Sequence, residues 1–512
     1  MADIKRDNIL EIKSLPGIKR DGTRLEGEAY VDGQWVRFQR GLPRKIGGYR
    51  SINKFLNGIS RGLHAFTQND LTYVHSGSFN KVERFYIDST NNTSVIVDRT
   101  PTTGFTVDAD NVWQFDVDSD STQNLIMAQV APNGRNLANS NGGALFSGPI
   151  LGTGALTPVT LPSGGNCTGG VVSLHPYTFI YGTNGYVAWS IPGDPTDFTG
   201  TGSGSANVAA QKLVKAMPLR GGPGNSPSGL FWSADALVRG TFVGGASVFQ
   251  FDTISTESSI LSPNSVIEYD GVFYWAGVDR FLMFNGVVRE VPNALNLNWF
   301  FDGLNETQAQ KVFAFKVPRY GEIWWCYPRD GATECSHAVI YNVRENCWYD
   351  CELPNGGRSA GFSPSVFRKP LLTGVQPSTS GYKLWVHETG VDEVDGIVTQ
   401  PILSYFETAD ISLPVLAQTN RQLHILSLEP DFVQSGDMEV SVHGRFNARS
   451  PEIESTPLSF PAVATNPQQT LITLKEQRRQ LRFRFTSNVV GGDYQMGLIL
   501  AHFQPGDGTM VG

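Results

Sequence analysis

Charged residues, cysteines and long apolar runs are all scarce in this chain of 512 residues. Asp, Glu, Lys and Arg make up 17% of it, against roughly 25% in an average soluble domain. No apolar run approaches the ~18 residues that a transmembrane helix needs, so we expect no membrane insertion. Five cysteines are sparse and odd in number, which argues against a secreted disulfide scaffold.

Export signals and common catalytic motifs are also missing. The opening residues, MADIKRDNILEIK, have no apolar stretch behind their charges, so we expect synthesis and folding in a cytosol. The sequence has no P-loop, no H-E-x-x-H motif and no G-x-S-x-G elbow, and its eight histidines are scattered. From these absences we expect no enzymatic activity and no cofactor.

One acidic string resembles the start of a calcium loop. In DVDSDST (116–122) the three aspartates match the first, third and fifth ligand positions, but Ser121 and Met127 stand where such a loop has Gly and Glu. An acidic turn is the favoured interpretation, and a metal ion at 116–120 is left open.

Cysteines and aromatic residues gather between residues 311 and 351. Cys326, Cys335, Cys347 and Cys351 contain no C-x-x-C pair, so free buried thiols are favoured over a zinc site. Aromatic pairs such as Trp324-Trp325 could line a sugar site, but packing between strands is the favoured interpretation.

Glycine and proline are abundant, with 55 and 29 residues, and they separate short apolar runs. Turn signals divide five segments into predicted strands: 62–77, 175–190, 265–291 (three strands), 311–350 (four strands) and 369–390. The units recur about every 40–50 residues, the repeat length of propeller blades. We predict an all-β fold with a β-propeller of six or seven irregular blades over 51–395; two or three separate β-sandwiches are the alternative.

Other segments interrupt this pattern. The Gly-rich stretches 142–170 and 200–205 are predicted to be loops or insertions, as is 218–229. Short helices are predicted at 205–217 and 305–313.

The pattern of apolar and polar residues changes near residue 396. From there, period-two alternation predicts a C-terminal antiparallel β-sandwich-like domain over 396–512. In RQLRFRF, alternation places Leu481, Phe483 and Phe485 on one face of a strand. Arg482 and Arg484 then lie on the other face, which we expect to point to solvent or to a partner.

Positive charge is concentrated in two places. Residues 1–50 carry a net charge of +4 and residues 475–484 another +4, which leaves −16 for the rest of a chain whose total is −8. We treat 1–50 as a basic N-terminal segment and expect surfaces with different roles.

Two segments carry a family resemblance. The early one, QWVRFQRGLPRKIGGYRSI (34–52), and the late one, EQRRQLRFRFTSNVVGGDYQMGLILAHFQPGDG (476–508), resemble motifs of the tail nozzle proteins of short-tailed bacteriophages, also called packaged-DNA stabilisation or tail tubular proteins. The matching residues proposed as interface positions are Arg37, Phe38, Gly41, Lys45, Gly47, Gly48, Arg478, Arg479, Arg482, Arg484 and Gly497.

The resemblance implies a structural virion protein that forms the lower tube of a short tail, retains packaged DNA and conducts it during ejection. It implies a homo-hexamer, assembled in the host cytoplasm, that contacts the adaptor ring below the portal, tail fibres or spikes, and double-stranded DNA in the lumen. The first alternative is a carbohydrate-binding or carbohydrate-active β-propeller. A third possibility is a cellular scaffold propeller that binds proteins.

Overall fold

The computed structural model describes residues 8–23, 28–88, 93–132, 143–163, 165–219, 227–245, 247–363, 369–413, 421–447, 449–462 and 471–506. Strands dominate these ranges. Their helical elements are short: α1 (Leu297–Gly303), η1 (Thr183–Gly185) and η3 (Glu306–Lys311). Within the same ranges, no helix has the length and hydropathy to span a membrane.

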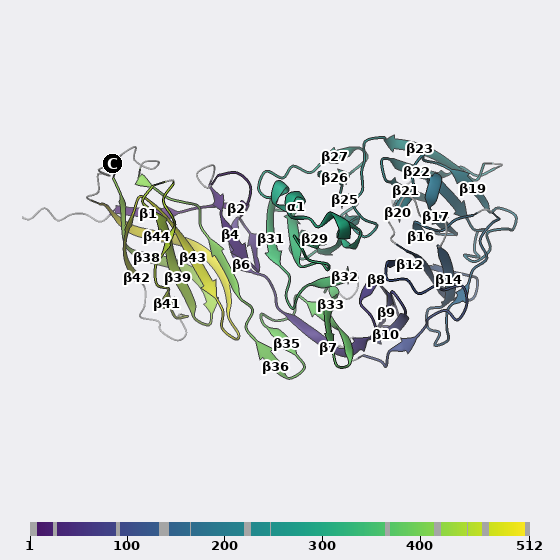
Figure 1. Cartoon of the computed structure of the whole chain (residues 1–512), viewed down its shortest axis with the longest axis horizontal. Helices are drawn as coiled ribbons and strands as arrows, with labels where there is room; N and C mark the ends of the chain where they lie inside the picture. The colour runs from purple at the N-terminus through teal and green to yellow at the C-terminus, as the bar shows by residue number, and fades with distance from the viewer. Residues whose placement is uncertain are drawn as a thin grey trace, which may run out of the picture.

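Seven antiparallel blades, each built on four consecutive strand positions, form a β-propeller in the described part of the chain (Figure 1). Blade 1 contains β8 (Ser60–Gln68), β9 (Leu71–Ser78), β10 (Val82–Ile87) and β11 (Val97–Asp98). Blade 2 contains β12 (Asn111–Ser119), β13 (Asn124–Pro132), β14 (Ala144–Pro149) and β15 (Thr157–Pro158). Blade 3 contains β16 (Gly170–Leu174), β17 (Tyr177–Tyr181), β18 (Tyr186–Trp189) and β19 (Gly204–Asn207).

The remaining four blades follow the same order. Blade 4 contains β20 (Leu213–Pro218), β21 (Ser228–Ser233), β22 (Leu237–Phe242) and β23 (Phe249–Ser255). Blade 5 contains β24 (Ile267–Tyr269), β25 (Val272–Ala276), β26 (Phe281–Phe284) and β27 (Val288–Glu290). Blade 6 contains β28 (Phe313–Val317), β29 (Glu322–Tyr327), β30 (His337–Asn342) and β31 (Cys347–Glu352). Blade 7 contains β32 (Arg358–Phe362), β33 (Leu371–Ser378), β34 (Gly381–His387) and β7 (Tyr49–Leu56).

The ring closes because the early strand β7 completes the last blade. β7 pairs antiparallel with β34, so residues near the start of the chain form the outer strand of blade 7. The first strand of blade 1, β8, contacts the first strands of both blade 2 and blade 7. The prediction of a six- or seven-bladed propeller is therefore confirmed, with seven blades.

Turn chemistry accounts for much of this pattern. Between β8 and β9, Asn69 and Asp70 both have positive φ angles, 51° and 60°, as a type I′ hairpin requires. Between β24 and β25, Asp270 and Gly271 have φ angles of 50° and 81°. Both turns stand where the sequence predicts them.

Several local predictions are wrong. The predicted helix at 205–217 is instead the end of β19 and most of β20, because pairing with β18 and β21 overrides its local helical preference. The Gly-rich stretch 142–170 contains β14 and β15, the outer strands of blade 2, and segment 265–291 forms four strands rather than three. At 305–313 a short 3-10 helix, η3, forms as the sequence suggests.

Two facing sheets form the C-terminal β-sandwich that the sequence predicts. The first contains β42 (Ile472–Arg478), β38 (Leu423–Ser435), β44 (Asp493–Pro505), β6 (Leu42–Lys45), β5 (Val36–Gln39) and β1 (Asn8–Ile12). The second contains β4 (Asp32–Gln34), β37 (Ser404–Glu407), β43 (Gln480–Ser487), β39 (Met438–Arg445), β40 (Ile453–Glu454) and β41 (Leu458–Phe460). Phe406, Phe432, Phe485 and Tyr494 pack against one another in its core.

The prediction of a separate N-terminal segment over 1–50 is wrong for its described part. β1, β5 and β6 pair within the first sheet of the sandwich and β4 pairs with β37 in the second, while β2 (Leu15–Ile18) and β3 (Ala29–Tyr30) form a short parallel pair. The purple N-terminal strands accordingly lie beside the yellow-green C-terminal ones in Figure 1. β1 and β6 pair with β44, and β4 pairs with β37, so these strands find partners near the other end of the chain that local pattern does not reveal.

The sandwich and the propeller share an apolar core. Trp35 of the sandwich packs edge-on against Trp324 of blade 6, with ring centroids 6.1 Å apart, and Phe38 packs against Tyr349 at 5.4 Å. The hairpin of β35 (Glu393–Asp395) and β36 (Val398–Gln400) extends blade 7 beside this contact and projects from the molecule (Figure 1). We call the contact between the sandwich and blades 6 and 7 the junction.

Candidate functional site

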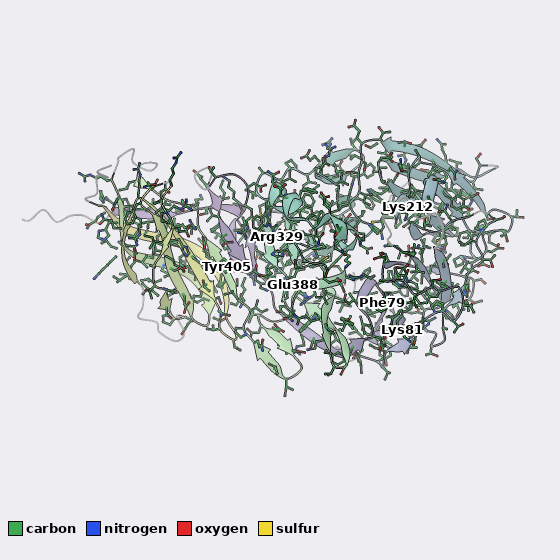
Figure 2. The ribbon with its side chains drawn as sticks, viewed as in Figure 1. Phe79, Lys81, Lys212, Arg329, Glu388 and Tyr405 are labelled. Atoms are coloured by element: carbon green, nitrogen blue, oxygen red, sulfur yellow. The ribbon has the colours of Figure 1, made fainter. Side chains whose placement is uncertain are left out.

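Arg37, the central residue of the early motif, lies buried at the junction. Its Nε lies 2.9 Å from Glu322 Oε1 in β29, and its Nη1 donates to Glu388 Oε2, just after β34, at 2.9 Å. Although burial alone would lower it, the pKa of Arg37 is raised by the charges of Glu322 and Glu388. One guanidinium therefore joins the sandwich to two blades of the propeller. Figure 2 shows Glu388 between the blades and Tyr405 of the sandwich.

The carboxylate of Glu322 is satisfied from several sides. Tyr349 Oη donates to Glu322 Oε1 at 2.6 Å, and Trp324 Nε1 donates to Oε2 at 3.0 Å. On the other side of the guanidinium, the ring of Tyr320 lies 3.8 Å from the Arg37 Cζ. A buried charge with this many partners fixes the geometry around it.

Phe38 and Gly41 attach the next part of the motif to blade 6. The carbonyl of Phe38 accepts a hydrogen bond from Asn342 Nδ2 at 3.3 Å. The amides of Arg40 and Gly41 donate to the two carboxylate oxygens of Glu345, at 2.8 and 2.9 Å. Arg40 and Gly41 have φ angles of 56° and 74°, so the turn exposes two adjacent N–H groups to one carboxylate.

Lys45 is buried within the sandwich. Its Nζ donates to the carbonyl of Gly492 at 2.7 Å, which links the early motif to the late one. Burial lowers the pKa of Lys45, against the attraction of Asp392 and Asp493.

Gly47 and Gly48 pass through a space too narrow for a side chain. A Cβ on Gly48 would lie 2.3 Å from the carbonyl oxygen of Asp392, and one on Gly47 would lie 2.7 Å from Glu388 Oε2. Gly48 also exchanges backbone hydrogen bonds with the same connection, since its N–H donates to Gly390 and its carbonyl accepts from Thr389. These glycines are explained by a close backbone approach.

Arg482 lies inside the sandwich, so the prediction that it points to solvent or to a partner is wrong. Leu481, Phe483 and Phe485 are buried as the alternation predicts, but the opposite face is covered as well. Arg482 Nε donates to Glu407 Oε2 at 2.7 Å and Nη2 donates to Glu452 Oε1 at 2.6 Å.

A third carboxylate, Asp410, lies 3.4 Å from Arg482 Nη1. Although burial opposes the change, Glu407, Glu452 and Asp410 raise the pKa of Arg482. The basic run KEQRRQLRFR is thus partly neutralised within the chain.

The other late-motif arginines are more accessible. Arg484 lies 3.6 Å from the ring centre of Tyr405 and 3.5 Å from Glu407, with 28% of its side chain exposed. Arg478 pairs with Glu476 at 3.1 Å, and the N–H of Arg479 donates to the carbonyl of Arg445.

Gly497 in β44 lies close to the backbone of the neighbouring strand β38. A Cβ there would lie 2.6 Å from the carbonyl oxygen of Asp431 in the neighbouring strand β38. The described motif residues therefore hold the chain's own parts together, and Arg37, Gly41, Gly47 and Gly48 do so at the junction.

Polar side chains fill the centre of the propeller. Gln114 of blade 2 donates to Asn264 Oδ1 at 2.9 Å and accepts from Lys215 Nζ of blade 4 at 2.7 Å. The hydrogen bond between Gln114 and Lys215 joins the first strands of blades 2 and 4, which are not neighbours in the ring. Removal from water raises the pKa of Asp116 to about 6 and lowers that of Lys215 to about 8.

The acidic string 116–122 is engaged by the protein itself. Asp116 accepts from the N–H of Ser173, Asp118 accepts from Thr178, and Asp120 accepts from Thr122. Among the described residues, no group of three or more His, Cys, Asp or Glu side chains is arranged to hold a metal ion. The aspartates serve blade 2 and its contact with blade 3.

The cysteines are free and buried, as expected, and burial raises the pKa of each of the four in blade 6. Glu322, Glu345 and Glu388 were missed as site residues. Each is an isolated acidic residue in a strand or turn. The only signal for them in the sequence is indirect, since the basic residues of the early motif need carboxylate partners if they are buried.

Comparison with known proteins gives no family-model match and no match among curated proteins. Among solved structures, the chain is similar to an exo-β-1,3-galactanase from Phanerochaete chrysosporium with galactose, at 9% identity and a TM-score of 0.31 over 90% of this chain and 100% of that one. It is also similar to an ancestral GH74 enzyme, at 12% identity and a TM-score of 0.41, over 70% of this chain and 51% of that one.

These similarities correct one expectation. Both solved structures are those of enzymes, which contradicts the prediction that the chain has no enzymatic activity, and we do not maintain that prediction. At these identities and TM-scores, the activities and substrates belong to those two proteins. The chain itself is a seven-bladed β-propeller joined to a β-sandwich.

Proposed function

We propose that this chain is a structural subunit of the nozzle of a short phage tail, where it retains packaged DNA and conducts it during ejection. One observation carries the proposal: the early motif, which bears the family resemblance, forms the junction between the two domains. Arg37, Gly41, Gly47 and Gly48 all contact the propeller.

A rigid junction suits a tube subunit. Domains in one chain ordinarily move relative to each other unless their interface is large and apolar. Here Trp35 and Phe38 continue the apolar core across the junction, and the ion pairs of Arg37 hold its centre. The two domains can therefore transmit force as one body.

The path of DNA would lie between subunits. The axis of the propeller is filled by Gln114, Lys215 and Asn264, so the lumen would be the opening of a ring of six copies. Outside the two basic segments the net charge is −16, and acidic walls bind phosphates weakly, which favours sliding.

Mass photometry of the purified chain tests the assembly. A hexamer of the 56.0 kDa chain gives a species of about 336 kDa, because six copies contribute equally to a closed ring. A monomer at every concentration, with and without double-stranded DNA, would contradict the proposal. In the virion, the partners would be the adaptor ring and the tail fibres or spikes.

A carbohydrate-active or carbohydrate-binding propeller is the second candidate, and one cavity favours it. A polar cavity of about 380 Å³ is lined by Asn298, Trp299, Asp302 and Asp330, among others. Carboxylates, an amide and an aromatic ring are the groups that orient sugar hydroxyls and support acid–base chemistry. Arg329 also lines the cavity and packs over the Trp299 ring, with its Cζ 3.7 Å from the ring centre.

Release of reducing ends from a panel of oligosaccharides tests this candidate. Loss of hydrolysis in Asp302→Asn and Asp330→Asn, with activity retained in the exposed control Asp110→Asn, would support it. Absence of both hydrolysis and binding by the wild-type chain would contradict it.

A further inference from the structure

A cleft of about 950 Å³ opens beside the junction, between the sandwich and blades 6 and 7. Basic side chains line it from three directions: Arg44 and Lys45 from β6, Lys316 and Arg319 from the β28–β29 hairpin, and Lys369 from the segment before β33. These residues are distant in the sequence and come together only when the chain folds. The local sequence therefore does not reveal this concentration of positive charge.

The acidic residues of the cleft are already engaged. Glu388 binds Arg37 through both carboxylate oxygens, and Asp493 accepts the N–H of Tyr494 at 2.9 Å. Lys316 pairs with Glu268 at 3.1 Å. Glu388 and Lys316 are thus held by partners other than Arg44, Arg319 and Lys369.

Three cations remain without a carboxylate partner among the described residues. Arg44 donates only to the side-chain amide of Gln39, at 3.0 Å. Arg319 lies over the Tyr320 ring at 5.3 Å and forms no ion pair in the described ranges, and neither does Lys369. The rim therefore offers two arginines and a lysine to an external anion.

The floor of the cleft is apolar. Val317, Pro318, Tyr320, Pro370 and Val391 line it between the charged groups. Arg37 holds the Tyr320 ring from one side. An apolar floor below a basic rim fits a ligand that combines carboxylates with apolar side chains.

We propose that this cleft binds an acidic segment of a partner polypeptide. Carboxylates of the segment pair with Arg44, Arg319 and Lys369, and its apolar side chains pack on the floor. Arginine suits this role because its planar guanidinium forms bidentate pairs with carboxylates. The apolar floor favours a peptide over a nucleic acid, whose backbone presents phosphates and sugars. The proposal holds whether or not the chain forms a ring.

Fluorescence anisotropy with the full chain tests the proposal. The probe is a short fluorescein-labelled peptide of alternating Glu and Leu, with three comparison probes: the same peptide with Lys for Glu, a labelled single-stranded DNA and a labelled duplex. We expect the wild-type chain to bind the acidic peptide best and to lose affinity as salt rises. The variant Arg319→Glu/Lys369→Glu should bind it at least about tenfold more weakly, because two attractions become repulsions.

The control variant Arg239→Glu/Arg289→Glu changes net charge equally, on blades 4 and 5, and should bind the acidic peptide like the wild type. Circular dichroism confirms that each variant is folded. The proposal is overturned if the wild type does not bind the acidic peptide, if both variants weaken binding equally, or if either DNA binds more tightly than the peptide.

Discussion

Arg37 and Glu322 form a fully buried ion pair across 285 positions of the sequence, with Nε and Oε1 2.9 Å apart. Arg37 belongs to the sandwich and Glu322 to blade 6. Their side chains are only 1% and 0% exposed. This pair lies at the centre of the junction that connects the two domains.

Arg37→Met should destabilise the protein by about 3–5 kcal/mol, because it leaves the carboxylates of Glu322 and Glu388 buried without their cation. Chemical denaturation followed by tryptophan fluorescence measures the change. The double variant Arg37→Met/Glu322→Gln should recover part of the lost stability, because the neutral Gln replaces one of the two carboxylates that Arg37→Met leaves unpaired.

Arg289→Met, on the exposed strand β27, is the matched control and should change stability by less than about 0.5 kcal/mol. An Arg37→Met variant as stable as this control would show that the ion pair does not hold the junction.

Gly48→Ala should destabilise by roughly 1–3 kcal/mol, because the added methyl would lie 2.3 Å from the Asp392 carbonyl oxygen and the backbone would have to move. Gly41→Asn is the comparison. Its φ is +74°, but a Cβ there would have no atom within 4 Å, and Asn tolerates this conformation. In thermal unfolding, the melting temperature of Gly48→Ala should therefore be well below that of Gly41→Asn. The reverse order would refute the close-approach explanation.

Arg482→Met and Arg484→Met should separate sharply although the residues are two positions apart. Arg482 is buried among Glu407, Asp410 and Glu452, so its loss should cost about 3–5 kcal/mol. Arg484 is 28% exposed and stacks on Tyr405, so its loss should cost about 1 kcal/mol. Equal costs in urea denaturation would contradict the buried cluster.

The sequence predicts the propeller more readily than the junction. Turn pairs such as Asn69-Asp70 act locally, so they reveal hairpins and the blade period. The place of 1–50 depends on strand pairing with residues beyond 400, such as Leu10 with Ala501, and no local pattern carries that information. Likewise, the alternation of apolar and polar residues predicts which face of the strand Arg482 lies on, but it does not reveal the carboxylates that cover this face.

The filled axis of the propeller predicts a specific pH dependence. The pKa of Asp116 is raised to about 6 in the folded protein, so between about pH 4 and 6 the folded state holds more protons at this site and its stability falls as pH rises. The pKa of Lys215 is lowered to about 8, so between about pH 8 and 10 the unfolded state holds more protons and stability rises with pH.

Urea denaturation across these two pH windows measures the free energy of unfolding. The difference between the wild type and the matching variant gives the contribution of each group. Asp116→Asn removes the acidic contribution and Lys215→Met removes the basic one. Identical pH profiles for the wild type and both variants would show that these groups do not titrate in the axis.

Cryo-electron microscopy of the purified full-length chain tests the central proposal most directly. A nozzle subunit predicts class averages of closed six-fold rings, with an open central channel wide enough for a DNA duplex, bounded by propellers and sandwiches in fixed orientation. Single, unassembled particles with no ring at any concentration would contradict it.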